Sequence, residues 1–190
     1  MSESQAAWLP FVVAAVVVLI GIAGLLIWRK RRGRVTVHSA LKAIAVDRLE
    51  DILVPDGMGG EIHIEHLILT TRGILVINIK QYEGVIWASD RMDQWTAMGR
   101  EGRSTFRNPL PTLYDRVAAV RQVVRDVDVA GYVLFPAHAD FSKGRPADVM
   151  LPDDLIAGFG KPEQADLARL IEAFEPYWEK IRGAVKPASA

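Results

Sequence analysis

The longest uniformly apolar stretch of the chain lies near its N-terminus. Residues 8–28 are 21 positions without a charged side chain, and the stretch begins with Trp8 and ends with Trp28. At about 1.5 Å of rise per residue, an α-helix of this length spans about 31 Å, which matches the roughly 30 Å hydrocarbon core of a bilayer. Indole rings favour the headgroup level at either end. The pattern predicts a transmembrane helix over residues 8–28, after a short N-terminal segment at 1–7.

The charges on either side of this stretch predict its orientation. Glu3 is the single charged residue before it, and a basic juxtamembrane segment, residues 29–34, follows it. The basic side chains directly after the stretch are Arg29, Lys30, Arg31 and Arg32. Positive residues stay on the cytoplasmic side of a membrane, so we expect the N-terminus outside and the following domain in the cytoplasm, at the inner membrane in a bacterium. A cleaved signal peptide has the reverse order, with its positive charge before the apolar run.

Beyond residue 34 the pattern alternates between helical and strand-like segments. Apolar residues at three- and four-residue spacing predict helices over residues 35–53, 108–127 and 163–182. Runs rich in β-branched residues predict strands at 61–69, 74–80, 84–87, 94–97 and 129–135. Turn-forming residues mark breaks at 54–60 and 70–73, and segments 100–107 and 137–162 are expected to be loops. Residues 184–190 are expected to form a frayed tail.

The order of these elements indicates the fold class. The short link between the strands at 61–69 and 74–80 predicts an antiparallel hairpin. A helix, this hairpin with further strands, a helix, a strand and a last helix together predict an α/β domain with a mixed sheet and helices on its faces. We place this domain at residues 35–183.

Composition and charge exclude several classes of protein. The chain has no cysteine, which excludes disulfides and thiolate metal sites. Residues 1–34 hold five basic side chains and one acidic one, so the remainder carries 18 basic and 22 acidic side chains, a net charge of −4. Strong nonspecific nucleic-acid binders are usually basic, whereas the basic cluster here lies beside the apolar stretch, where it can meet anionic lipids. The glycine-rich turn at 54–60 lacks the lysine ending of a phosphate-binding loop.

The hairpin is where polar side chains interrupt strongly apolar strands. By period-two alternation, Asn78 and Lys80 lie on one face near the end of their strand, and Glu65 can face them across the hairpin. His63 and His66 are three residues apart in a strand and point to opposite faces, so they form a poor pair of metal ligands. The polar groups at Glu65, Asn78 and Lys80 are therefore the candidate site.

Residues 41–135 resemble the NERD domain, a nuclease-related domain of the PD-(D/E)xK nuclease superfamily. In that family a strand ending in Ile-Asp-His precedes the pattern Gly-Ile/Val-x-Val-Ile-Glu-x-Lys and a further glycine, and later come a tryptophan and an Asn-Pro-Leu that opens a helix. The matching residues here are Ile64-Glu65-His66, Gly73 to Lys80, Gly84, Trp95 and Asn108-Pro109-Leu110. The resemblance covers roughly half the chain, and it implies a restriction-endonuclease-like mixed sheet flanked by helices.

The resemblance also implies catalytic positions. Glu65 stands for the family's aspartate and is the metal ligand, Asn78 stands for its glutamate, and Lys80 stands for its lysine. In such sites two carboxylates hold Mg²⁺, and the metal and the lysine activate a water against a phosphodiester. Asn78 removes one negative charge from this set. Nuclease relatives often carry a glutamate on the first helix, where this chain has Lys42.

These departures leave three functional hypotheses open. The first is a catalytically degenerate nuclease fold, anchored in a membrane, that binds nucleic acid or protein. The second is an active DNA phosphodiesterase that uses Mg²⁺ in a rearranged site, with Glu61 or Glu83 supplying a ligand. The third is a membrane-associated protein-interaction scaffold. The expected partners are the lipid bilayer and DNA or a protein; no small-molecule cofactor is implied.

A basic segment offers a second candidate contact with nucleic acid. Arg100, Arg103 and Arg107 lie close together in the predicted loop, with Phe106 between them. Arginines in such a loop can contact a phosphate backbone. The alternative is an ordinary solvated loop.

Overall fold

The computed structural model describes residues 35–160 and 164–188. The predicted transmembrane helix at 8–28, with Trp8 and Trp28, and the basic segment at 29–34 lie outside these residues. Within the described ranges, no helix combines the length and apolar character needed to cross a bilayer. The chain from Val35 onward belongs to one compact unit.

This unit contains helices and strands in mixed order. The helices are α2 (Val37–Ile44), α3 (Leu110–Val123), α4 (Pro152–Phe159) and α5 (Gln164–Ala184). The strands of the first half are β1 (Asp47–Pro55), β2 (Glu61–Thr70), β3 (Gly73–Ile79), β4 (Gly84–Trp87), β5 (Gln94–Gly99) and β6 (Gly102–Arg107). The later strands are β7 (Val129–Leu134), β8 (Ala139–Asp140), β9 (Val149–Met150) and β10 (Lys186–Pro187).

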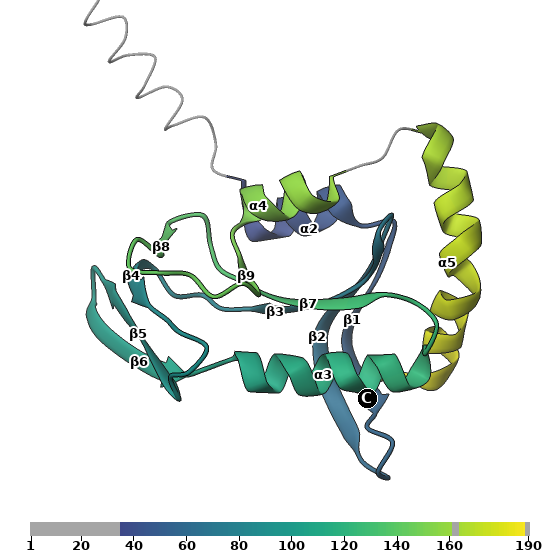
Figure 1. Cartoon of the computed structure of the whole chain (residues 1–190), viewed down its shortest axis with the longest axis horizontal. Helices are drawn as coiled ribbons and strands as arrows, with labels where there is room; N and C mark the ends of the chain where they lie inside the picture. Colours follow the sequence, from purple (N-terminus) through teal and green to yellow (C-terminus); the bar gives the residue numbers. More distant parts are fainter. Residues whose placement is uncertain (1–34, 161–163, 189–190) are drawn as a thin grey trace, which may run out of the picture. The chain divides into compact units, whose positions relative to one another are not determined.

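The described strands form two mixed sheets. The large sheet has the order β10-β1-β2-β3-β7-β9, and the small sheet has the order β6-β5-β4-β8 (Figure 1). Strands β2 and β3 pair antiparallel, as the short link predicts, whereas β3 and β7 pair parallel. The predicted α/β class with a mixed sheet flanked by helices is therefore confirmed, and the structure adds a second, smaller sheet.

Strand β3 lies between two layers of helices. Ile74 and Val76 belong to the core that α3 covers, and Leu75 and Ile77 belong to the core that α2 and α4 cover. Figure 1 shows α2 and α4 side by side on one face of the large sheet and α3 on the other. A strand that is buried on both faces carries apolar residues at consecutive positions, which explains the unbroken apolar run of β3 in the sequence.

The predicted helix at 35–53 is wrong beyond Ile44. Residues Asp47–Pro55 form β1, which pairs antiparallel with β2. Leu49 and Ile52 pack in the same core although they are three residues apart, because Asp51 between them has a φ of 53°. A left-handed residue in a strand interrupts the usual alternation of faces. The resulting three-residue spacing imitates a helix.

Three other segments also differ from the expectation. The predicted loop at 100–107 contains β6, which pairs with β5 along its whole length. The predicted loop at 137–162 contains β8, β9 and α4. The tail includes β10, which pairs with Ile52 and Leu53 of β1. Each of these segments is short or polar and is ordered by pairing or packing with a distant part of the chain. The sequence pattern carries no trace of that pairing.

Candidate functional site

The candidate site lies where β2 and β3 separate. Their backbone pairing ends at His66 and Ile77, while β2 continues to pair with β1 as far as Glu61. Beyond that point the backbone N–H of Ile79 donates to Oε2 of Glu65 at 3.2 Å. The carboxylate thus takes the place of a β2 carbonyl in the fork between the strands. Because Ile79 lies between Asn78 and Lys80, the structure brings all three predicted residues to this point.

Asn78 is the most deeply buried residue of the site. The residue is 2% exposed, and its Oδ1 atom has no hydrogen-bond partner among the residues that the structure describes. It lies on the face of β3 that carries Ile74 and Val76, towards α3. A buried acceptor without a partner costs about 1–3 kcal/mol, so most are satisfied in folded proteins. The site therefore holds an acceptor that a ligand or a water could satisfy.

Lys80 continues from the end of β3. Its backbone N–H donates to the carbonyl of Leu134 at 3.0 Å and extends the parallel pairing with β7 by one step. Its side chain is half-buried, and among the described residues it forms no ion pair. The backbone of Lys80 is thus held next to Ile79, whose N–H bonds to Glu65.

Arg116 of α3 is a candidate residue that the sequence analysis missed. Its Nε and Nη1 atoms are buried and have no partner within the described residues. Leu113 and Val117 pack over Gly131 of β7, and Tyr114 on one flank of the helix bonds to Asp148. Helical spacing places Arg116 on the opposite flank, which faces β3 and β2. The sequence signal that could have identified Arg116 is its position between Leu113 and Val117, which are both buried.

The direction of α3 brings Arg116 closer to the fork. The helix ends near the start of β7, where Arg121 donates to the carbonyl of Val129 at 2.7 Å. Its first turn therefore lies towards the ends of β7 and of the parallel β3. Arg116 lies in the first half of α3, which is the half nearer to the ends of β3 and β7.

The residues at the fork do not fit a Mg²⁺ ion. Such an ion requires several oxygen ligands, mostly anionic, and the carboxylate of Glu65 at the fork already accepts the N–H of Ile79. The nearby carboxylates of β1 are already engaged, with Asp51 bonded to His63 at 2.6 Å and Glu50 paired with Arg48 at 3.3 Å. No group of three or more potential metal ligands exists among the described residues.

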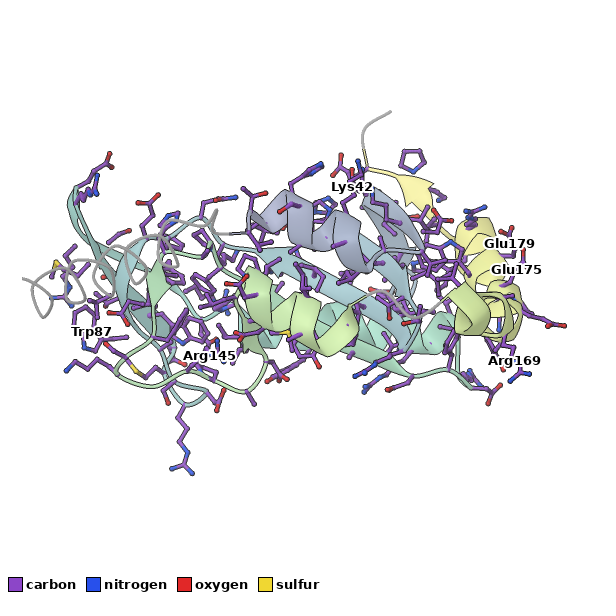
Figure 2. All side chains as sticks on the ribbon, turned by 90° about the horizontal axis from the view of Figure 1, so that it is seen from above. Lys42, Trp87, Arg145, Arg169, Glu175 and Glu179 are labelled. Carbon is purple, nitrogen blue, oxygen red and sulfur yellow. The ribbon has the colours of Figure 1, made fainter. Side chains whose placement is uncertain are left out.

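The suggested substitute ligands are also engaged elsewhere. Glu61 accepts a hydrogen bond from Lys186 at 2.7 Å, and Glu83 pairs with His138 at 2.7 Å. Lys42 is exposed on α2 (Figure 2), on the side of the sheet opposite to the face of Asn78. None of the three supplies an acidic ligand to the fork.

The other motif residues have structural roles. The Nδ2 atom of Asn108 donates to the carbonyl of Met92 at 2.9 Å and to that of Asp90 at 3.4 Å, and its Oδ1 accepts from the N–H of Leu110 at 3.0 Å. It thereby joins the turn between β4 and β5 to the start of α3. Gly84 has a φ of 77°, and a Cβ there would lie 2.1 Å from the carbonyl oxygen of Met98. These residues shape the framework around the fork.

The basic segment is divided between two sides of the small sheet. Phe106 faces inward, where it stacks on Tyr82 at 3.8 Å between ring centroids. Arg100, in the turn between β5 and β6, borders an open pocket of about 430 Å³ that Tyr82 also lines. Arg103 and Arg107 lie on the other side of the sheet, so the three predicted arginines do not form one cluster with Phe106.

Comparisons with known proteins identify the family of the chain. A family model described as nuclease-related domain matches residues 29–136. An uncharacterized protein of Bacillus anthracis is 25% identical over 100 residues, which cover 51% of this chain and 47% of that protein. The chain thus spans about half the length of this curated relative. No solved structure matches the chain significantly.

Proposed function

Because the chain belongs to the family of nuclease-related (NERD) domains, we propose that it is a catalytically degenerate nuclease fold that binds nucleic acid. The observation that carries this proposal is the state of Asn78. At the position where the resemblance places the metal-binding glutamate, a neutral amide is buried with its Oδ1 unpaired. The fork keeps one carboxylate, and that carboxylate already accepts the N–H of Ile79.

The charges around the fork favour an anion. Lys80 and Arg116 are both cationic and lack carboxylate partners among the described residues, while the carboxylate of Glu65 already accepts the N–H of Ile79. Hydrogen bonds between charged donors and phosphate oxygens are stronger than neutral ones. Together Lys80 and Arg116 would hold a backbone phosphate without a bridging metal ion.

The second candidate is an active phosphodiesterase that uses Mg²⁺. Its support is the same unpaired Oδ1 of Asn78, which could serve as a neutral oxygen ligand beside Glu65. Under this candidate the metal would hold the phosphate, and Lys80 would stabilise the charge that develops on it. A single carboxylate makes such an ion weakly bound.

Plasmid cleavage separates the two candidates. The full-length chain, purified in a neutral detergent, is incubated with supercoiled plasmid and with Mg²⁺ or Mn²⁺. We expect no nicking with either metal, together with DNA binding that weakens steeply as salt is raised. Asn78→Glu restores the second carboxylate and is the matched variant in which metal-dependent nicking would first emerge.

Two results would contradict the proposal. Nicking by the unchanged protein that Lys80→Ala abolishes would establish the active phosphodiesterase. Absence of both cleavage and DNA binding would favour a protein-interaction scaffold instead. Lys42→Ala, an exposed lysine on the opposite side of the large sheet, is the charge-matched control for Lys80→Ala.

We further propose that the domain is anchored in a membrane by residues 8–28 and faces the cytoplasm. The support is the uncharged stretch between Trp8 and Trp28 and the basic residues 29–34 that follow it. Carbonate extraction of membranes tests the anchor, since an integral protein stays in the pellet. The full-length chain should remain there, and a chain lacking residues 1–34 should not. Protease access to the domain in sealed spheroplasts would contradict the cytoplasmic orientation.

A further inference from the structure

Strands β4, β5 and β6 present one face of the small sheet to solvent. The register pairs Trp87 with Thr96 and Thr96 with Thr105, and it pairs Met98 with Arg103. Side chains of directly paired residues lie on the same face of a sheet, and so do residues two apart in one strand. One face therefore carries Val85, Trp87, Gln94, Thr96, Met98, Arg103, Thr105 and Arg107, and the edge strand β8 adds Asp140, which pairs with Val85. We call this set the outer face.

The outer face is exposed although it carries large apolar side chains. Trp87 is 37% exposed and Met98 is 43% exposed, and Arg103 and Arg107 are also exposed. The opposite face of the same strands is buried: Trp95 and Ala97 lie in the core. Figure 2 shows Trp87 at the end of the unit opposite α5, which carries Glu175 and Glu179. Trp87 and Met98 thus place two large, exposed apolar side chains on the same face of one small sheet.

The charge of the outer face differs from that of the unit as a whole. Strands β4, β5 and β6 contain no acidic residue, and Asp140 of the edge strand β8 lies at the edge of the sheet opposite to β6, which carries Arg103 and Arg107. Within the part of the chain that the structure describes, Arg103 and Arg107 form no ion pair. Residues 35–190 nevertheless carry a net charge of −4, so the outer face is more basic than this part of the chain as a whole. This arrangement complements an anionic partner.

We propose that the outer face binds single-stranded nucleic acid. An unpaired base would stack on the ring of Trp87, and Arg103 and Arg107 would contact backbone phosphates. The two arginines are four residues apart in one strand, which separates them by about 13 Å, so they would contact different phosphates. Stacking on an aromatic ring combined with a basic surface is how proteins hold single strands without reading sequence.

The chemistry of the face favours a nucleic acid over a lipid surface. Binding at a bilayer interface grows with the apolar area that enters it. Here Trp87 and Met98 are surrounded by hydroxyl and guanidinium groups, which suit a sugar-phosphate chain. The inference rests on the proposed function for its class of ligand, but it uses a surface separate from the fork at the β3 end.

Fluorescence anisotropy with a labelled oligothymidylate tests the inference. The probe has about 20 nucleotides, longer than a single-strand site of roughly 4–16, and the full-length chain is held in a neutral detergent. We expect Trp87→Ala to weaken binding roughly tenfold with an unchanged salt dependence, and Trp87→Phe to recover most of that loss.

The double variant Arg103→Ala with Arg107→Ala tests the phosphate contacts. Each phosphate contact contributes about 0.7 to the slope of log affinity against log salt for single strands, so the slope should become shallower by about 1.4. Arg72→Ala with Arg125→Ala is the matched control, because it removes two exposed arginines from turns elsewhere. The control should bind within about twofold of the unchanged protein.

The outcomes separate this inference from the proposed function. Failure of the unchanged protein to bind the oligonucleotide would overturn both. Binding that Lys80→Ala weakens, but that the variants of Trp87, Arg103 and Arg107 leave at the level of the control, would overturn the inference alone. A third result would also overturn it: no oligonucleotide binding, with Trp87 emission shifting in nanodiscs of phosphatidylglycerol but not of phosphatidylcholine, would assign the face to anionic lipid. The difference between the spectra of the unchanged protein and of Trp87→Phe isolates that emission.

Discussion

Two asparagines of this protein are buried to almost the same extent, Asn78 with 2% and Asn108 with 4% of its surface exposed. Asn108 uses both ends of its amide, which bond to two carbonyls of the turn between β4 and β5 and to the N–H of Leu110. Asn78 leaves its Oδ1 without a partner. The fold supplies hydrogen-bond partners for both ends of the Asn108 amide, whereas no described residue supplies one for the Oδ1 of Asn78.

This difference distinguishes a residue that stabilises the fold from a residue of the candidate site. A buried amide with every bond made rigidifies the elements it joins, and removing it leaves several backbone groups unpaired. A buried amide with an open acceptor lowers the stability of the empty protein and is retained where a ligand can complete it. Asn108 therefore belongs to the scaffold, whereas Asn78 belongs to the site that we propose with Glu65 and Lys80.

The largest expected effect comes from Asn108→Leu, which keeps the shape of the side chain and removes its polar atoms. It leaves the carbonyls of Asp90 and Met92 and the N–H of Leu110 without partners. We expect the free energy of unfolding to fall by about 3 kcal/mol. Urea denaturation followed by circular dichroism measures it. A loss below about 1 kcal/mol would mean that water replaces these bonds and that Asn108 is no framework residue.

The second prediction concerns Asp47, whose carboxylate forms an ion pair as well as hydrogen bonds. Burial raises the pKa of its carboxyl, but hydrogen bonds from the Trp178 indole at 2.8 Å, from the Arg48 N–H and from Arg182 more than offset this, so its pKa lies below the usual 3.8. Because the pKa is depressed in the folded state, this stabilisation is present above the unfolded pKa and is lost as pH falls through the folded pKa.

Asp47→Asn should therefore destabilise the protein at neutral pH and cease to matter in acid. We expect a loss of about 1 kcal/mol at pH 7, since the group is partly exposed and its ion pair is screened. Urea midpoints of the two proteins, measured from neutral pH downward, should begin to converge near the unfolded pKa of 3.8 and should coincide below the folded pKa. A constant difference across that range would show that the shape of the side chain, and not its charge, ties α5 to β1.

Asn78→Leu should give a smaller change of opposite sign. The substitution removes the unpaired acceptor and keeps the volume, so the free energy of unfolding should stay unchanged or rise by up to about 1 kcal/mol. Binding of nucleic acid should weaken in the same variant. The measurement pairs urea denaturation with oligonucleotide anisotropy. A destabilisation as large as that of Asn108→Leu would remove the distinction between the two asparagines.

The smallest expected effect belongs to Tyr114, whose hydroxyl donates to Asp148 at 2.8 Å. Burial and this bond raise the pKa of the phenol to about 12. Because the folded pKa is raised, the stabilisation is present below the unfolded pKa near 10 and is lost between pH 10 and about 12. Tyr114→Phe should cost a few tenths of a kcal/mol at pH 7 for so exposed a group. Ultraviolet difference titration should lose one late phenol transition in this variant.

Much of the central fold could be predicted from local patterns. The hairpin of β2 and β3, the strand β7 and the helix α3 follow from apolar runs and turn residues that lie within each segment. The same hairpin predicted that Glu65, Asn78 and Lys80 would meet. Strands β1, β6 and β10 could not be predicted. In β1 the left-handed residue Asp51 gives the apolar residues a three-residue spacing like that of a helix, β6 is polar, and β10 is very short.

The sequence by itself determined the hairpin, its three polar residues and the alternation of helix and strand, since these depend on neighbours a few positions apart. The membrane helix at 8–28 stays a prediction of the sequence. Only the tertiary structure decided that the acceptor of Asn78 and two donors of Arg116 are buried without partners among the described residues, and that Trp87, Arg103 and Arg107 share one exposed face. Those properties depend on which distant segments pair and which polar groups they leave unpaired, and no local pattern of residues encodes that.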